Sequence, residues 1–329
     1  MTTAALLEVS NLFVEFHTRD GIARVINGVS FALNAGETLA ILGESGSGKS
    51  VTAQAIMGIL DMPPAVIPSG AILYEGRDLL ALPEGERREV RGKDIAMVFQ
   101  DALSALNPVF PVGWQISEAL RKRRGLTKTD ALARALTLMD QVKIPAAKAR
   151  LHDYPHQFSG GMRQRVMIAM ALALDPRVLI ADEPTTALDV TVQAQIMELI
   201  AELRRERQMA MILITHDLGV VAGVADRIAV MYAGRIVEHA DVRALYARPA
   251  HPYTEGLLDS IPRLDQRGRD LRTIPGLPPN LTRIPSGCPF HPRCPRVAPI
   301  CRTDLPPDVD LGGGRTSACH FARELLHGA

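Results

Sequence analysis

The chain has 329 residues, 47% of them hydrophobic, and its 37 basic side chains nearly cancel 36 acidic ones. This length suggests about two domains, and the balanced charge gives no electrostatic reason to expect a nucleic-acid partner. The longest apolar run, 166–174, is too short to span a bilayer, and the N-terminus lacks the features of a secretion signal, so the sequence predicts a cytosolic protein.

Three apolar runs along the chain are typical of buried parallel strands: 38–42, 178–181 and 211–215. Helix-like segments alternate with them, beginning with 51–60, and this alternation predicts an α/β fold built on a mainly parallel sheet. Polar residues follow each run at once. Because ligands bind beyond the carboxyl ends of parallel strands, we expect residues 43–50, Asp182 with Glu183, and His216 to converge on one site.

Two segments depart from this alternation. Residues 101–173 are rich in helix formers, notably at 116–123 and 131–142, and are predicted to form a helical insertion. From about Pro249 onward, proline and glycine become frequent, as in 275–279, so we expect a loop-rich appendage there.

The residues after the first strand match the phosphate-binding pattern G-x-x-x-x-G-K-S/T: Gly43, Glu44, Ser45, Gly46, Ser47, Gly48, Lys49 and Ser50. Backbone N–H groups of such a loop point at phosphate oxygens, and the following helix adds its positive end. Lys49 is expected to reach the β- and γ-phosphates, and Ser50 to bind Mg²⁺. The alternative is a glycine-rich turn with a solvated lysine, which the preceding strand and following helix disfavour.

A pair of acids ends the second apolar run. Asp182 is expected to hold the Mg²⁺ shell, and Glu183 to polarise a water for attack on the γ-phosphate. Two solvated acids at a strand end are the alternative, which the phosphate-binding loop makes less favoured. His216, after the third run, is expected to contact the γ-phosphate, although a lone histidine is more often structural.

Residues 158–165 resemble the signature motif of ATP-binding cassette (ABC) ATPases. Gln100 is similar to the Q-loop glutamine of that family, residues 187–189 to its D-loop, and residues 215–217 to its switch histidine. The motifs follow in the family's order from about residue 7 to residue 239, so an unrelated P-loop enzyme such as a kinase is a poor alternative.

The resemblance implies a P-loop NTPase core with an antiparallel β subdomain and a helical insertion. Residues 1–100 and 174–248 are then the two parts of the nucleotide-binding core, and 101–173 the helical signature subdomain. Phe16 is expected to stack on adenine. Gln100 is expected to join Ser50 and Asp182 at Mg²⁺, and to act in catalysis with Glu183 and His216.

In this family the signature of one subunit completes the nucleotide site of another, so the resemblance implies a dimer. Ser159, Gly160, Gly161 and Asp189 are the residues expected to contribute there. Met162 replaces the glutamine that usually follows Ser-Gly-Gly. Because Ser159 and backbone N–H groups meet the phosphate, we expect this change to be tolerated. Residues 162–165 also resemble the variant seen in peptide importers.

All four cysteines of the chain lie in the tail: Cys288, Cys294, Cys301 and Cys319. Clustered thiols in a cytosolic protein favour metal ligation over disulfides, although two disulfides stay possible. Four thiolates suit either a tetrahedral zinc or an iron–sulfur cluster, and the wide gaps favour the cluster. The tail 249–329, including 251–254, resembles the C-terminal region of oligopeptide and dipeptide importer ATPases, which implies a 4Fe–4S cluster.

The resemblance identifies the chain as an ATPase subunit of an importer for dipeptides or short oligopeptides, most similar to the dipeptide permease ATPases. It implies a second ATPase subunit, often in a heterodimer, two membrane-spanning permease subunits and an extracytoplasmic peptide-binding protein. The expected location is the cytoplasmic face of the inner membrane, as a peripheral subunit. The alternatives are another cargo (nickel, glutathione or antimicrobial peptides), an ABC exporter, or a soluble ABC ATPase that does not transport.

Overall fold

The computed structural model describes residues 5–186, 188–260 and 273–327. The chain forms two compact units, one from Met1–Ala81 with Ile214–Ala329 and one from Leu82–Leu213, and each is described by itself. Among the described residues, no helix is long and apolar enough to cross a membrane.

The first unit contains an antiparallel sheet near the N-terminus, which confirms the expected antiparallel β subdomain. Its strands are β1 (Leu7–Thr18), β2 (Gly21–Leu33), β4 (Ala65–Val66), β5 (Ala71–Tyr74) and β6 (Arg77–Asp78), in the order β2-β1-β5-β6 with β4 beside β1. Buried side chains alternate along β1 on either side of an irregularity in the pairing, at Leu7 and Val9 before it and at Leu12 and Val14 after it. This period of two places one face of the sheet against the core.

A second group of strands in the same unit runs in the order β12-β13-β11-β10-β3. The strands are β3 (Thr38–Leu42), β10 (Arg227–Tyr232), β11 (Arg235–Asp241), β12 (Val309–Gly312) and β13 (Arg315–Ser317). β3 and β10 are parallel, whereas the β10–β11, β11–β13 and β12–β13 pairs are antiparallel. The sheet is therefore mixed where the sequence predicts a mainly parallel one, because two hairpins extend it beyond β10.

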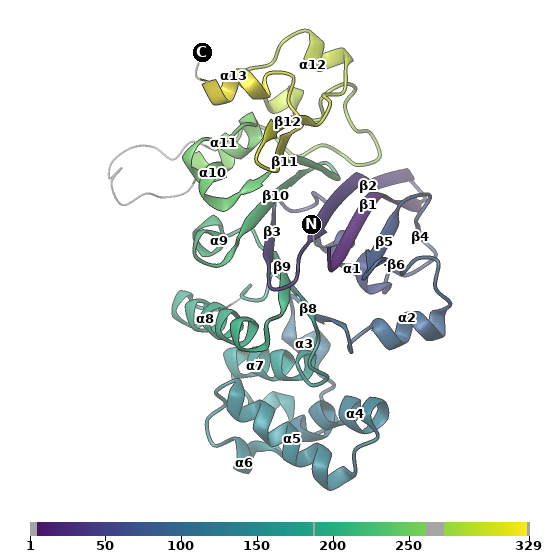
Figure 1. Cartoon of the computed structure of the whole chain (residues 1–329), viewed down its shortest axis with the longest axis vertical. Helices are drawn as coiled ribbons and strands as arrows, with labels where there is room; N and C mark the ends of the chain where they lie inside the picture. Colours follow the sequence, from purple (N-terminus) through teal and green to yellow (C-terminus); the bar gives the residue numbers. More distant parts are fainter. Residues whose placement is uncertain (1–4, 187, 261–272, 328–329) are drawn as a thin grey trace. The chain divides into compact units, whose positions relative to one another are not determined.

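The C-terminal region also differs from the expected loop-rich appendage. β13 pairs with β11, so the tail extends the sheet instead of hanging from it (Figure 1). Short helices cover this part of the unit, and long connections between them remain. The helices of the first unit are α1 (Lys49–Met57), α9 (Leu218–Val224), α10 (Val242–Ala247), α11 (Pro252–Asp259), η2 (His291–Arg293), α12 (Ile300–Thr303) and α13 (Ala322–His327).

The second unit combines three strands with most of the long helices. β7 (Ile95–Val98), β8 (Val178–Asp182) and β9 (Ala210–Ile214) run in the order β9-β8-β7, with β7 and β8 parallel. All of their residues are buried. Together with β3, strands β8 and β9 confirm the three strands predicted from the apolar runs, to within one residue at each end.

The segment 101–173, predicted as a helical insertion, is mainly helical and lies within this unit. α4 contains the predicted segment 116–123, α5 contains 131–142 except its last residue, and the two helices pack on each other and on α7 (Figure 1). The helices are α2 (Glu84–Val90), α3 (Ala102–Ala105), α4 (Val112–Arg124), α5 (Lys128–Gln141), α6 (Ala147–Arg150), η1 (Pro155–Gln157), α7 (Gly160–Ala171) and α8 (Val190–Arg207).

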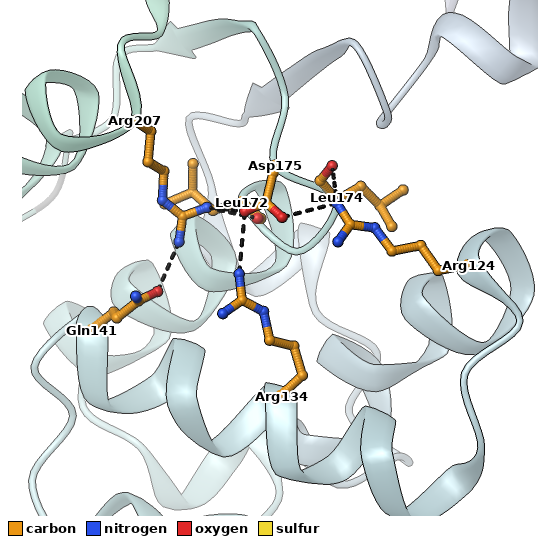
Figure 2. A network of polar contacts seen from close by, with 7 residues as sticks. All are labelled: Arg124, Arg134, Gln141, Leu172, Leu174, Asp175 and Arg207. Carbon is orange, nitrogen blue, oxygen red and sulfur yellow. Dashed lines mark hydrogen bonds and ion pairs between the residues drawn. The ribbon is translucent and has the colours of Figure 1, made fainter.

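Asp175 joins three helices of this unit through their arginines (Figure 2). Its carboxylate accepts from Arg124 of α4 at 2.9 Å, Arg134 of α5 at 3.2 Å and Arg207 of α8 at 2.7 Å. Arg124 and Arg207 also donate to the carbonyls of Leu174 and Leu172, beside Asp175. One carboxylate thus compensates three cations near the end of the loop that leads into β8.

We expect Asp175→Asn to lower the free energy of unfolding of this unit by about 1–2 kcal/mol at low salt, because three arginines lose their counter-charge. Asparagine tolerates the positive φ of 54° at this position, so the change tests charge apart from backbone strain. Urea unfolding followed by the fluorescence of Trp114, the one tryptophan of the chain, reports on the unit directly. Glu118→Gln, which removes an exposed i,i+4 pair with Lys122, should cost under about 0.5 kcal/mol. Equal costs for the two variants would contradict a network role.

Candidate nucleotide-binding and cysteine sites

The phosphate-binding loop connects β3 to α1, as the sequence predicts. Gly43 follows β3 with a φ of 153°, and a Cβ there would lie 2.3 Å from the Met231 carbonyl oxygen and 2.8 Å from Ser47 Oγ. Gly48 has a φ of 107°, and a Cβ on it would lie 2.8 Å from the Val25 carbonyl oxygen. Both glycines are required by space as well as by backbone conformation.

The start of α1 is arranged to receive an anion. Gly48 is its N-cap and offers no side-chain cap, and no acidic residue stands in the first turn. The first backbone N–H groups of a helix have no partner within the helix, and the helix dipole makes this end positive. Ser47 is only 5% exposed, and its Oγ is buried with no hydrogen-bond partner in the described part of the chain. The loop therefore presents donors suited to phosphate oxygens.

Lys49 is buried at the base of this loop, 5% exposed. Its Nζ donates to the carbonyl oxygens of Gly43 at 2.8 Å and Glu44 at 3.0 Å. These bonds hold the ammonium group inside the curve of the loop. Ser50, the expected Mg²⁺ ligand, is half-buried in the first turn of α1.

His216 lies at the same end of β3 as this loop. The N–H of the preceding residue, Thr215, donates to the Ile41 carbonyl at 3.4 Å, and His216 itself is exposed. The structure thus brings His216 close to the start of the phosphate-binding loop.

Phe16, expected to stack on adenine, is half-buried in β1, where it pairs with Ala23 of β2 and Ala65 of β4.

In the second unit, β8 delivers the two acids. Asp182 is the last residue of β8 and is 4% exposed. Glu183 follows with a φ of 44°, a value that residues other than glycine rarely adopt. Glu183 Oε2 accepts from Gln100 Nε2 at 3.0 Å and from Thr186 Oγ1 at 2.9 Å. Two predicted catalytic residues are therefore in direct contact. Strain of this kind concentrates at functional sites, and it turns Glu183 out of the strand.

The signature residues open α7 of the same unit. Ser159 is the N-cap, and its Oγ accepts from the N–H of Met162 at 3.3 Å. No acidic residue occupies the first turn of α7, so this helix end is also favourable to an anion. A Cβ on Gly161 would lie 2.7 Å from Val192 Cγ1, which explains the need for glycine.

Asp189 caps α8, accepting from the N–H of Val192 at 2.9 Å, and is exposed. Ala187, in the expected D-loop, lies outside the described residues. The sequence-predicted nucleotide residues thus fall into two sets, one in each unit.

One cavity in the C-terminal region is lined by all four cysteines. The thiols are free; Cys301 and Cys319 are buried, and Cys288 and Cys294 are half-buried. The N–H of Cys288 donates to the Cys301 carbonyl at 2.9 Å, which ties the first cysteine loop to α12. Segments that are separate in the sequence therefore bring four sulfur atoms to one cavity.

Three of the thiols in this cavity, Cys288, Cys294 and Cys319, have raised pKa values. Burial raises the pKa of Cys288 and of Cys319 to about 11, and it raises the pKa of Cys294. The neighbouring thiols add to the shift, because each new negative charge would face the others. Within the described residues, no three His, Cys, Asp or Glu side chains form a group that could hold a metal ion.

Sequence reasoning missed several partners of these residues. Thr186 donates to Glu183, and His251, His291 and His320 line the cysteine cavity. Arg293 binds the side chain of Glu44 in the phosphate-binding loop. The position of Thr186 three residues after Glu183 was a usable local signal. The contact between Arg293 and Glu44 joins residues 249 positions apart, so no local sequence signal could have indicated it.

We expect Gly43→Ala to lower the free energy of unfolding by roughly 3 kcal/mol and to abolish nucleotide binding, because its Cβ would meet backbone that cannot move aside. Gly46→Ala is the matched control. It shares a positive φ, 79°, but a Cβ there meets nothing within 4 Å, so its cost should be about 1 kcal/mol. Thermal unfolding and binding of a fluorescent ATP analogue measure both effects, and equal behaviour of the two variants would refute the steric argument.

Comparisons with known proteins find two family regions in the chain. The ABC transporter family model matches residues 26–186, and the model for the oligopeptide/dipeptide transporter C-terminal region matches residues 237–301. The oligopeptide transport ATP-binding protein OppD of Salmonella typhimurium is 53% identical over 321 residues, covering 98% of this chain and 95% of that protein. The dipeptide transport ATP-binding protein DppD of Bacillus subtilis is 51% identical over 314 residues, covering 95% and 94%.

Solved structures agree on the fold of the cassette. A dimeric ATP-binding cassette in a post-hydrolysis state, with ADP and phosphate bound, superposes with a TM-score of 0.65 at 27% identity. The match covers 72% of this chain and 99% of that one. Sequence identity above 50% across nearly the whole length, with both family regions present, places this chain in the family of ABC ATPases that are the ATP-binding subunits of oligopeptide and dipeptide transporters.

Proposed function

We propose that this chain binds and hydrolyses ATP to power the import of dipeptides or short oligopeptides. The observation that carries the proposal is the start of α1 without a side-chain cap, where glycines and a buried lysine shape a loop suited to an anion. It stands in a chain that carries both the cassette and the peptide-transporter C-terminal region.

On this proposal, the residues at the start of α1 bind the phosphates and Mg²⁺. The N–H groups at the start of α1 bind the β- and γ-phosphates, and Lys49 leaves the loop carbonyls to neutralise their charge. Ser50, Asp182 and Gln100 would hold Mg²⁺, which supplies compensation for the charge that develops on the phosphates. Phe16 provides a ring for adenine.

Glu183 is the proposed general base. Its carboxylate takes a proton from the attacking water, and its orientation is fixed by the hydrogen bonds from Gln100 and Thr186. His216 orients the same water and contacts the γ-phosphate. Because Gln100 touches Glu183 directly, any movement of Gln100 would change the position of the base.

The signature residues need a second cassette in order to act. Ser159, Gly160 and Gly161 present a helix N-terminus, and Asp189 stands at the start of α8, all of them accessible or partly accessible. We propose that they complete the nucleotide site of a partner ATPase subunit, identical or related. The relative solved as a dimer supports this arrangement.

Peptides are the proposed cargo because relatives named for oligopeptide and for dipeptide transport match almost the whole chain. The relatives named as ATP-binding proteins of peptide transport support separate permease subunits as partners. We propose two such subunits, fed by an extracytoplasmic peptide-binding protein, with this chain bound peripherally at the cytoplasmic face of the inner membrane.

The cysteine cavity is proposed to hold a 4Fe–4S cluster. Four thiols around one cavity suit a polynuclear centre, whose iron atoms spread the ligands more widely than one tetrahedral zinc does. The raised thiol pKa values fit this assignment, because the charge of bound iron is what makes buried thiolates stable. When bound, the cluster would cross-link the cysteine loops and α12. Zinc is the alternative.

We expect Glu183→Gln to retain ATP binding, to lower turnover by about 10²–10³-fold and to trap the ATP-bound dimer, because the amide cannot accept the proton of water. Phosphate release and size-exclusion chromatography with ATP measure these effects. Glu198→Gln, an exposed change on α8, should keep normal turnover. Undiminished hydrolysis in Glu183→Gln would remove the assigned role.

We expect anaerobic purification to yield about four iron and four sulfide per chain, with visible absorption that is lost in Cys294→Ser. His320→Gln changes the same cavity without removing a thiol and should retain both elements. Zinc without iron and sulfide in the wild type would replace the cluster with the zinc alternative.

A further inference from the structure

We infer that Arg293 and Tyr253, two residues of the C-terminal region, are positioning residues that fix the phosphate-binding loop through Glu44. The inference rests on the proposed binding of ATP by residues 43–50 and adds a distant part of the chain to that site. Glu44 is the second residue of the phosphate-binding loop, whereas Arg293 directly precedes Cys294 in the cysteine cavity.

Arg293 donates to the Glu44 carboxylate from both terminal nitrogens of its guanidinium group. Nη1 donates to Glu44 Oε2 at 2.6 Å and Nη2 donates to Oε1 at 2.9 Å, while Nε donates to the Pro275 carbonyl at 2.9 Å. The Arg293 side chain is 5% exposed and lies over the ring of Tyr232, 5.8 Å from its centre. A bidentate, buried contact of this kind is both strong and directional.

Tyr253 holds the main chain of the same loop residue. The N–H of Glu44 donates to Tyr253 Oη at 2.9 Å, and the tyrosine is fully buried at the start of α11. Its ring packs against Phe290 and Tyr232, with ring centres 5.3 Å and 4.7 Å away. The hydroxyl is therefore held by a rigid aromatic cluster and cannot follow a moving loop.

Glu44 is consequently fixed at three points: its carboxylate by Arg293, its N–H by Tyr253 and its carbonyl by Lys49 at 3.0 Å. The next residues, Ser45 and Gly46, are exposed, and Gly46 has the conformational freedom of glycine. A loop of this composition loses backbone entropy when it closes on phosphates. Fixing its first part before nucleotide arrives reduces that loss and so raises affinity.

The contacts that hold Glu44 and the cysteine cavity share one loop. Phe290 lines the cavity and packs on Tyr253, and the turn His291–Arg293 leads into Cys294. Because Arg293 is held by the same short turn that presents Cys294, its reach to Glu44 depends on that turn keeping its shape. The C-terminal region thereby becomes part of the apparatus that binds ATP.

The test is the dissociation constant of a fluorescent ATP analogue with the purified full chain, at a temperature well below unfolding. We expect Arg293→Ala to raise it about tenfold, and Arg293→Lys to raise it less, because lysine keeps the charge without the paired contacts. Tyr253→Phe removes only the hydroxyl and should raise it severalfold. Arg293→Ala combined with Glu44→Ala should bind no more weakly than the weaker single variant, since one contact is lost in both.

Arg296→Ala is the matched control. Arg296 stands three positions further on, also borders the cysteine cavity and makes its exposed pair with Glu255 at 3.1 Å, not with Glu44. The dissociation constant of Arg296→Ala should therefore stay within about twofold of the wild-type value. Thermal unfolding and iron content are measured on every variant. If Arg293→Ala does not fold, Arg293→Lys and Tyr253→Phe decide the question.

Normal affinity in Arg293→Lys and Tyr253→Phe, even with a lowered melting temperature, would overturn the inference and leave these residues a structural role alone. Failure of the wild type to bind the analogue would instead refute the proposed ATP site.

Discussion

The nucleotide half of this protein depends on one constraint: backbone donors must stay available to phosphate while the loop that carries them stays in place. α1 begins at Gly48 without a side-chain cap, which would be unfavourable at an ordinary helix start. Gly43 and Gly48 provide the curve because no side chain fits beside the backbone of Met231 and Val25. The buried ammonium group of Lys49 stabilises the curved loop by donating to the Gly43 carbonyl.

The C-terminal region is integrated with this site far more closely than a loop-rich appendage would be. β13 pairs with β11, the rings of Tyr232, Tyr253 and Phe290 pack together, and Arg293 reaches Glu44. A buried arginine is tolerated only with a well-placed counter-charge, so this contact is costly to break. The four-cysteine cavity adjoins these anchors, because Phe290 lines it.

In the second unit, strand β8 illustrates how far local sequence rules extend. Apolar residues of β8 and the two acids after them were predictable, because buried parallel strands end where ligands bind. The positive φ of Glu183 and its hydrogen bonds with Gln100 and Thr186 could not be predicted from the sequence, because both depend on the packing around this residue. Asp175 likewise looked only like the end of an apolar run, yet it holds three helices.

The sequence by itself determined the family and the three buried strands, and it predicted a helical insertion and a set of nucleotide residues, because each depends on short-range patterns of glycine, charge and apolar period. It also indicated that four cysteines share a site. Only the tertiary structure decided that the sheet is mixed, that the tail extends it, and that Arg293 and Tyr253 secure the phosphate-binding loop. The contacts of Arg293 and Tyr253 with Glu44 join residues more than 200 positions apart, and no local pattern encodes which distant side chains the folded core brings together.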